Sequence, residues 1–149
     1  VTMCTPSPRP GAGFVNPDLW KNRETDPTSL RLEFDGMKGR QWLMKWLPAR
    51  AYDNAIYAVF SNSIGMDDDQ LKNGSSMIID PFGDILAECR TFDDSIVTAT
   101  ITSEKLTQAG GYRYIKARRP DLYKDIIGQS HKSEQKVIWL DNRKPNINS

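Results

Sequence analysis

Two short apolar runs flank the tetrapeptide Asp-Pro-Phe-Gly, and this pattern constrains the fold more than any other feature of the chain. The runs cover residues 76–79 and 84–89 of the segment NGSSMIIDPFGDILAEC. Proline presets the backbone angle that the second turn position requires, and glycine adopts the positive φ that other residues avoid. We therefore expect Pro81 and Gly83 to close a β-hairpin.

A helix and then a strand are predicted before the hairpin. Apolar residues recur at every fourth position of residues 37–55, which indicates one apolar helix face. The row consists of Leu43, Leu47, Ala51 and Ala55. Pro48 removes one intrahelical hydrogen bond, so we expect a kink or a break there. The run IYAVFSN at 56–62 is apolar and rich in β-branched and aromatic residues, which predicts a strand buried on both faces.

The segments around and after the hairpin complete the expected architecture. Residues 63–74 are interpreted as a polar loop, and the alternating run 95–101 as a further strand. From Thr102 the chain is polar and helical in pieces, and a short helix over 120–127 should begin at Pro120. A kinked helix packed on a sheet of these strands is an α/β or α+β layer.

The ends of the chain carry weaker patterns. Five prolines in residues 1–35 predict that neither a helix nor a central strand runs through this Pro-rich segment. Its aromatic and aliphatic residues indicate an ordered loop pinned to a surface, and a disordered linker is the alternative. Residues 128–149 are interpreted as a C-terminal tail.

Composition excludes several classes of function. Twenty basic and nineteen acidic residues give a net charge of +1, which supplies no field to attract nucleic acid or an anionic membrane. No apolar run approaches the roughly 20 residues of a membrane span, and no signal peptide opens the chain. Cys4 and Cys89 form no CxxC pair, so a reduced cytoplasmic protein is expected. His131 is the only histidine, which leaves a metal site without support.

Four local features have both a possible functional interpretation and a structural one. Cys4 has no base nearby in sequence, which favours a small apolar residue at a strand end over a nucleophile. The acidic run 67–69 lacks the spacing of a calcium loop and is interpreted as solvated. Basic and aromatic residues alternate in 112–124, which fits a helix surface or a subunit contact better than a nucleic-acid site. Asn62 ends an apolar strand, where it either braces the following loop or is a plain strand-end polar residue.

Several motifs, read in order, resemble the C-terminal half of a carbon–nitrogen hydrolase of the nitrilase superfamily. PARAYDNAIYAVFSNSIG at 48–65 resembles the helix-to-strand signature of that family, and NGSSMIIDPFGDILAE at 73–88 resembles its next signature. IVTATITSEKL is similar to the closing strand, and RRPDLY at 118–123 to the terminal segment. The resemblance covers residues 1–127, which we expect to be the C-terminal portion of a hydrolase domain.

The resemblance implies a fold and a reaction. The fold is α+β, as part of a four-layer α-β-β-α sandwich of the nitrilase type. The reaction is hydrolysis of a non-peptide C–N bond in a small amide, ureide or nitrile, through a thioester-type intermediate on a cysteine assisted by a glutamate and a lysine. This implies no cofactor and a homo-oligomer. The catalytic residues are expected upstream of Val1, so the fragment alone should be inactive.

The resemblance also assigns roles to residues of this chain. A wall of the substrate pocket is expected from Met3, Cys4 and Thr5. Structural bracing is expected from Arg50, Asn54 and Asn62. The alternative is a non-catalytic sandwich module used for subunit association.

Overall fold

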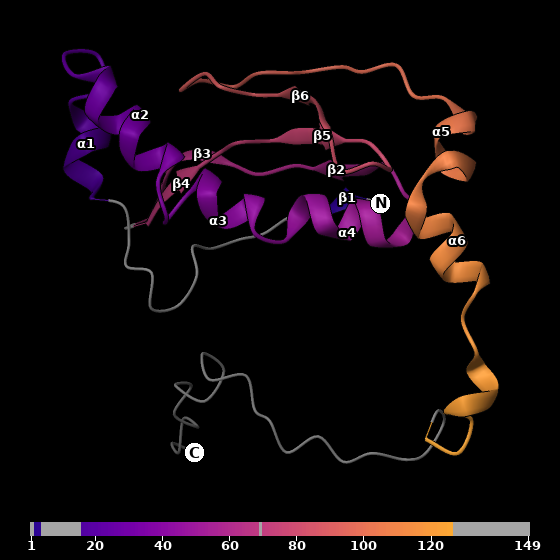
Figure 1. The fold of residues 1–149 in the computed structure, drawn as a ribbon. Coiled ribbons are helices and arrows are strands. Elements are labelled where there is room, and N and C mark those ends of the chain that lie inside the picture. The colour runs from indigo at the N-terminus through magenta and orange to yellow at the C-terminus, as the bar shows by residue number, and fades with distance from the viewer. Residues whose placement is uncertain (1, 4–15, 69, 127–149) are drawn as a thin grey trace, which may run out of the picture. The chain divides into compact units, whose positions relative to one another are not determined.

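The structure is a computed structural model and describes residues 2–3, 16–68 and 70–126. The chain divides into two compact units, Val1–Ala117 and Arg118–Ser149. The first unit holds the elements labelled in Figure 1. In chain order they are β1 (Thr2–Met3), α1 (Pro17–Lys21), α2 (Pro27–Asp35), α3 (Arg40–Met44), α4 (Leu47–Asn54), β2 (Ala58–Phe60), β3 (Ile64–Asp67), β4 (Gln70–Asn73), β5 (Met77–Ile79), β6 (Ile85–Glu88), α5 (Ser103–Gln108) and α6 (Gly110–Lys116).

The main sheet has the strand order β1-β2-β5-β6. β1 is parallel to β2, and the other neighbours are antiparallel. The β5–β6 hairpin is confirmed: the Gly83 N–H donates to the Asp80 carbonyl at 2.9 Å, and Gly83 has a φ of 87°. In the ladder Phe60 pairs with Met77, and Met77 pairs with Glu88. The end of β2, the start of β5 and the end of β6 therefore lie at one edge of the sheet.

Helices α3 and α4 cover one face of this sheet (Figure 1). The predicted row of apolar residues is confirmed, since all four are buried. The predicted break is also confirmed, and it falls at Lys45–Trp46, between the two helices. Pro48 lies in the first turn of α4, where a backbone N–H has no intrahelical partner to lose. The core on this face comprises Leu43, Leu47, Ala51, Ala58, Phe60, Met77 and Ile79.

The opposite face of the sheet is open within the described residues. Val59 is 40% exposed and Leu86 is 36% exposed. The expectation that residues 56–62 are buried on both faces is therefore wrong. Successive side chains of a strand point to opposite faces, so Ala58 and Phe60 enter the core while Val59 points away from it.

Two helices occupy the Pro-rich segment 1–35, so the expectation that no helix forms there is wrong. Pro17 and Pro27 each begin a helix, at the position where a missing N–H and a fixed φ are tolerated. Side-chain oxygens cap both helices: Asn16 accepts from the Asp18 N–H at 2.9 Å, and Asp26 accepts from the Ser29 N–H at 3.1 Å. In this segment proline marks the beginning of helices and does not prevent them.

The region interpreted as a polar loop, 63–74, is a second hairpin formed by β3 and β4. Asp68 takes a φ of 53° in the turn, which aspartate tolerates better than most residues do. Ile64 and Leu71 point inward from the two strands and join a second, smaller core with α1 and α2. That core comprises Leu30, Phe34 and Leu71, with Leu19, Trp20, Ile64 and Phe92 packed against it.

Two further expectations were wrong in part. Residues 95–101 are not part of a strand in the described chain, although Val97 and Ala99 are half-buried between exposed neighbours, of which Ile96 is 91% exposed. In the second unit, the helix expected over 120–127 is a single 3-10 turn, Pro120–Leu122, which does begin at the proline. The helical pieces expected after Thr102 are α5 and α6. Among the described residues, no helix has the length and apolar character needed to cross a membrane.

Candidate functional site

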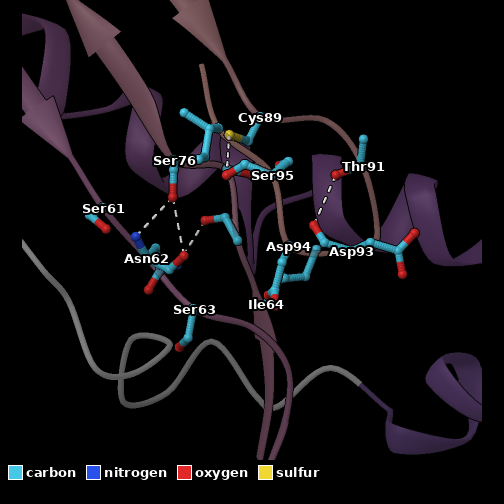
Figure 2. A pocket seen from close by; sticks show the side chains of 13 residues that line it. Ser61, Asn62, Ser63, Ile64, Ser76, Cys89, Thr91, Asp93, Asp94 and Ser95 are labelled. Carbon is cyan, nitrogen blue, oxygen red and sulfur yellow. Dashed lines mark hydrogen bonds between the residues drawn. The ribbon is translucent and has the colours of Figure 1, made fainter. Parts of the chain in front are cut away.

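A pocket of about 630 Å³ opens at the edge of the sheet where β2 ends (Figure 2). Its wall follows directly from the register of the sheet, because residues after β2, before β5 and after β6 meet there. The lining residues are Ser61, Asn62, Ser63, Ile64, Gly74, Ser75, Ser76, Cys89, Thr91, Asp93, Asp94, Ser95 and Ile96. The volume lies in the range of small-molecule sites.

Asn62 and Ser76 join the two sides of this pocket wall (Figure 2). The Asn62 N–H donates to Ser76 Oγ at 2.9 Å, and the Ser76 hydroxyl donates to the Asn62 carbonyl at 3.1 Å. Asn62 Nδ2 donates to the Gly74 carbonyl at 2.8 Å and lies 3.4 Å from Asn73 Oδ1. These bonds connect the end of β2 to the chain between β4 and β5, so they fix the spacing of the wall.

The segment after β6 forms the other wall. Cys89 is half-buried, and its Sγ lies 3.7 Å from the carbonyl oxygen of Ser95. The Thr91 hydroxyl donates to the Asp93 carbonyl at 3.0 Å, which holds the following loop in a tight bend. Asp93 and Asp94 are exposed and give this wall two negative charges, whereas none of the described residues that line the pocket is a lysine, arginine or histidine.

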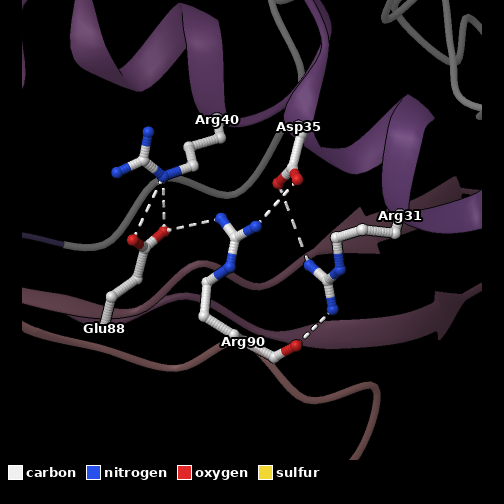
Figure 3. Close-up of polar contacts among 5 residues, drawn as sticks. All are labelled: Arg31, Asp35, Arg40, Glu88 and Arg90. Atoms are coloured by element: carbon white, nitrogen blue, oxygen red, sulfur yellow. Dashed lines mark hydrogen bonds and ion pairs between the residues drawn. The ribbon is translucent and has the colours of Figure 1, made fainter.

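Five charged residues form a network beside the pocket (Figure 3). Arg40 Nε donates to both carboxylate oxygens of Glu88, at 2.8 and 3.1 Å. Arg90 lies 2.7 Å from Asp35 and 3.4 Å from Glu88, and Arg31 lies 4.0 Å from Asp35 and donates to the Arg90 carbonyl. Burial lowers the pKa of Arg90, but the two carboxylates outweigh it and raise the pKa overall. The network ties α2 and α3 to the end of β6.

A second ion pair lies in the β5–β6 turn. Asp80 is 1% exposed, and its carboxylate accepts from the Phe82 N–H at 2.9 Å, the Asp84 N–H at 3.1 Å and Lys105 Nζ at 2.6 Å. Burial raises the pKa of Asp80, but these three hydrogen bonds together lower it below its usual range. The hydrogen bond to Asp80 raises the pKa of Lys105. This pair fixes the turn and α5, and it is not part of the pocket wall.

The structure brings only one of the predicted bracing residues to the pocket. Asn62 lines it, whereas Arg50 and Asn54 lie on α4, where Asn54 Nδ2 donates to the Arg50 carbonyl at 2.9 Å. Met3 ends β1 and pairs with Phe60, so the backbone of β1 reaches the same edge of the sheet. Cys4 and Thr5, like His131, lie outside the described residues.

Sequence reasoning missed Ser76 and the wall at 91–95. The local signal for that wall is the cluster of short polar residues in TFDDS, which is typical of a loop between structured segments. Nothing in the sequence pairs Ser76 with Asn62, because their contact arises from the β2–β5 register. Among the described residues, no group of three or more His, Cys, Asp or Glu is arranged to hold a metal ion.

Comparison with known proteins places these features in a family. The sequence profile of the family described as "Carbon-nitrogen hydrolase" matches residues 21–110. A glutamine-dependent NAD(+) synthetase of Aquifex aeolicus is 34% identical over 56 residues, which are 38% of this chain and 10% of that protein. A probable nitrilase of Schizosaccharomyces pombe is 30% identical over 81 residues, which are 53% of this chain and 30% of that protein.

A solved structure agrees with this match at the level of the fold. The crystal structure of a carbon–nitrogen hydrolase from Helicobacter pylori G27 superposes with a TM-score of 0.50 at 19% identity, over 62% of this chain and 34% of that one. The chain therefore spans about a third or less of the length of these relatives. Since the family profile covers more than half of the sequence, the chain belongs to the carbon–nitrogen hydrolase family.

Proposed function

We propose that this chain is the C-terminal part of a cysteine-dependent hydrolase that cleaves non-peptide C–N bonds in amides, N-carbamoyl compounds or nitriles. The observation that carries the proposal is the pocket at the edge where the parallel strands β1 and β2 both end. Ligands of sheets with parallel strands bind outside the carboxyl ends of those strands. Membership of the carbon–nitrogen hydrolase family supports the proposed class of reaction.

In the proposed reaction, a cysteine upstream of Val1 attacks the acyl carbon of an amide and forms a C–S bond. A lysine stabilises the negative oxygen, and a glutamate protonates the leaving nitrogen as the C–N bond breaks. Water then cleaves the thioester to release the acid. The chain described here contributes one wall of the pocket, which includes Asn62 and the segment that begins at Met3 and continues through Cys4 and Thr5.

The proposal includes an architecture for the whole enzyme. The open sheet face, with Val59 and Leu86, would receive a second sheet and complete a four-layer α-β-β-α sandwich. The enzyme would act as a homo-oligomer. The chain from Val1 onward lacks the catalytic set in this scheme, and it is expected to be inactive when separated from the upstream half.

The test is ammonia release by the full-length protein that contains this sequence, over a panel of amides, nitriles and N-carbamoyl amino acids. Prior alkylation of thiols should abolish the release. The Cys4→Ser variant should retain turnover within about tenfold, because loss of a nucleophile costs far more than loss of a wall residue. Complete loss in Cys4→Ser would show that the nucleophile lies in this chain.

A second candidate is a non-catalytic module that uses its half of the sandwich for subunit association. The exposed apolar side chains of Val59 and Leu86 favour it, since such a face needs a partner. A folded full-length protein that releases no ammonia from any member of the panel would support this candidate. Thiol-sensitive release would reject it.

A further inference from the structure

The lining of the pocket mixes polar and apolar groups and, within the described residues, carries no positive charge. Hydroxyl groups line both walls, among them those of Ser61, Ser63, Ser76 and Thr91. The hydroxyls of Ser76 and Thr91 donate within the wall, to the Asn62 and Asp93 carbonyls. A hydroxyl can also accept, so the hydroxyls of this wall can bind uncharged polar groups.

The nearest arginines are committed elsewhere. Arg90 lies in sequence between Cys89 and Thr91, which both line the pocket, yet its guanidinium pairs with Asp35 at 2.7 Å and Glu88 at 3.4 Å. Arg40 donates to Glu88 through Nε (Figure 3). A carboxylate in the pocket would thus find no lining cation within the described residues.

Two carboxylates in the pocket wall further disfavour a negatively charged ligand. Asp93 and Asp94 belong to the wall after β6, and like charges that approach in a partly enclosed site repel each other. A negative charge placed against this wall would lose its hydration without a compensating cation among the described lining residues. A hydroxyl or amide group of the ligand is not repelled by the two aspartates and loses no charge hydration, and an ammonium group is attracted by the aspartates.

We infer that the pocket selects substrates whose acyl group or N-substituent ends in a polar group without negative charge, either hydroxyl, amide or ammonium. The inference rests on the proposed function, because it assigns the pocket to the substrate of that hydrolase. It narrows the substrate class within amides and N-carbamoyl compounds.

The test measures turnover by the full-length protein of two compound series, monosubstituted ureas and primary amides. Within each series the chain length is constant, and only the end group changes among hydroxyl, ammonium and carboxylate. kcat/KM for the hydroxyl and ammonium compounds should exceed that for the carboxylate by about tenfold, the effect expected of a few exposed charges. The double variant Asp93→Asn/Asp94→Asn should reduce the preference for ammonium over carboxylate to about threefold or less. The matched control Asp53→Asn/Asp84→Asn removes two exposed carboxylates outside the pocket and should leave the preference unchanged.

Turnover that favours the carboxylate, or a preference that the Asp93→Asn/Asp94→Asn variant leaves intact, overturns the inference while the hydrolase assignment stands. Absence of any turnover rejects the proposed function and moves the test to binding, by calorimetric titration with 1,4-diaminobutane and with succinate. Diamine binding that weakens in the double variant, with no succinate binding, supports the inference. Succinate binding, diamine binding that is insensitive to the variant, or no binding of either probe overturns it.

Discussion

Replacing Asp80 by asparagine removes the negative charge from a side chain that is 1% exposed and keeps its shape. The Oδ1 atom of Asp80 accepts from two backbone N–H groups, and an asparagine oxygen can keep both bonds. The charge-assisted bond from Lys105 to Oδ2 is lost, and bonds of this kind contribute about 1.5–3 kcal/mol. Because the side chain of Lys105 is 39% exposed and remains hydrated, we expect Asp80→Asn to lower the free energy of unfolding by about 1–2 kcal/mol.

Asp80→Ala should cost more, because it also leaves the N–H groups of Phe82 and Asp84 without their acceptor. At about 1 kcal/mol for each lost backbone bond, the total is about 3–4 kcal/mol. Urea unfolding of the full-length protein, followed by circular dichroism, measures both variants. The matched control is Asp84→Asn, which makes the same chemical change at an exposed side chain of the same turn.

The pH dependence gives a second readout of this ion pair. The folded pKa of Asp80 lies below its ordinary value of 3.8, so its contribution is fully present above pH 3.8 and is lost as the pH falls through the folded pKa. The stability difference between the native protein and Asp80→Asn should therefore be constant near pH 7 and narrow below pH 3.8. A difference that persists in acid, or one that Asp84→Asn reproduces at neutral pH, would refute the reasoning.

Two further predictions concern packing and hydrogen bonding. Asn62→Ala removes the 2.8 Å hydrogen bond to the Gly74 carbonyl and should lower the free energy of unfolding by about 1–2 kcal/mol. The control Ser61→Ala, at the exposed neighbouring residue, should change it little. Equal urea midpoints for the two variants would contradict the bracing role of Asn62. Gly111→Ala would place a Cβ 2.2 Å from the Tyr52 carbonyl oxygen, so α6 must move from α4. That change should destabilise by about 1–3 kcal/mol, and a thermal midpoint identical to that of the native protein would contradict close packing of α6 on α4.

Local patterns determined the parts of the fold that local chemistry controls. The β5–β6 hairpin follows from Pro81 and Gly83, whose backbone preferences act within four residues. The helix row and the break at Lys45–Trp46, just before Pro48, likewise follow from periodicity and from the preference of proline for the first turn of a helix. Three of the four motifs that resemble the family lie inside the region 21–110 that the family profile matches, and the fourth, at 118–123, lies beyond it.

The same patterns misjudged segments whose state depends on their surroundings. The prolines of residues 1–35 were interpreted as barriers to helices, although Pro17 and Pro27 begin helices once Asn16 and Asp26 cap them. The run 95–101 alternates like a strand, but alternation produces a strand only where a neighbour offers backbone partners.

The sequence by itself determined the hairpin turn at 80–83 and the helix break just before Pro48, together with membership of the family. Only the tertiary structure decided which residues form the pocket, because the register between Phe60, Met77 and Glu88 sets which segments meet at the edge of the sheet. It also decided that Arg90 pairs with Asp35, 55 residues away, and is unavailable to a ligand. Pairings of this kind depend on long-range contacts, and no local propensity encodes them.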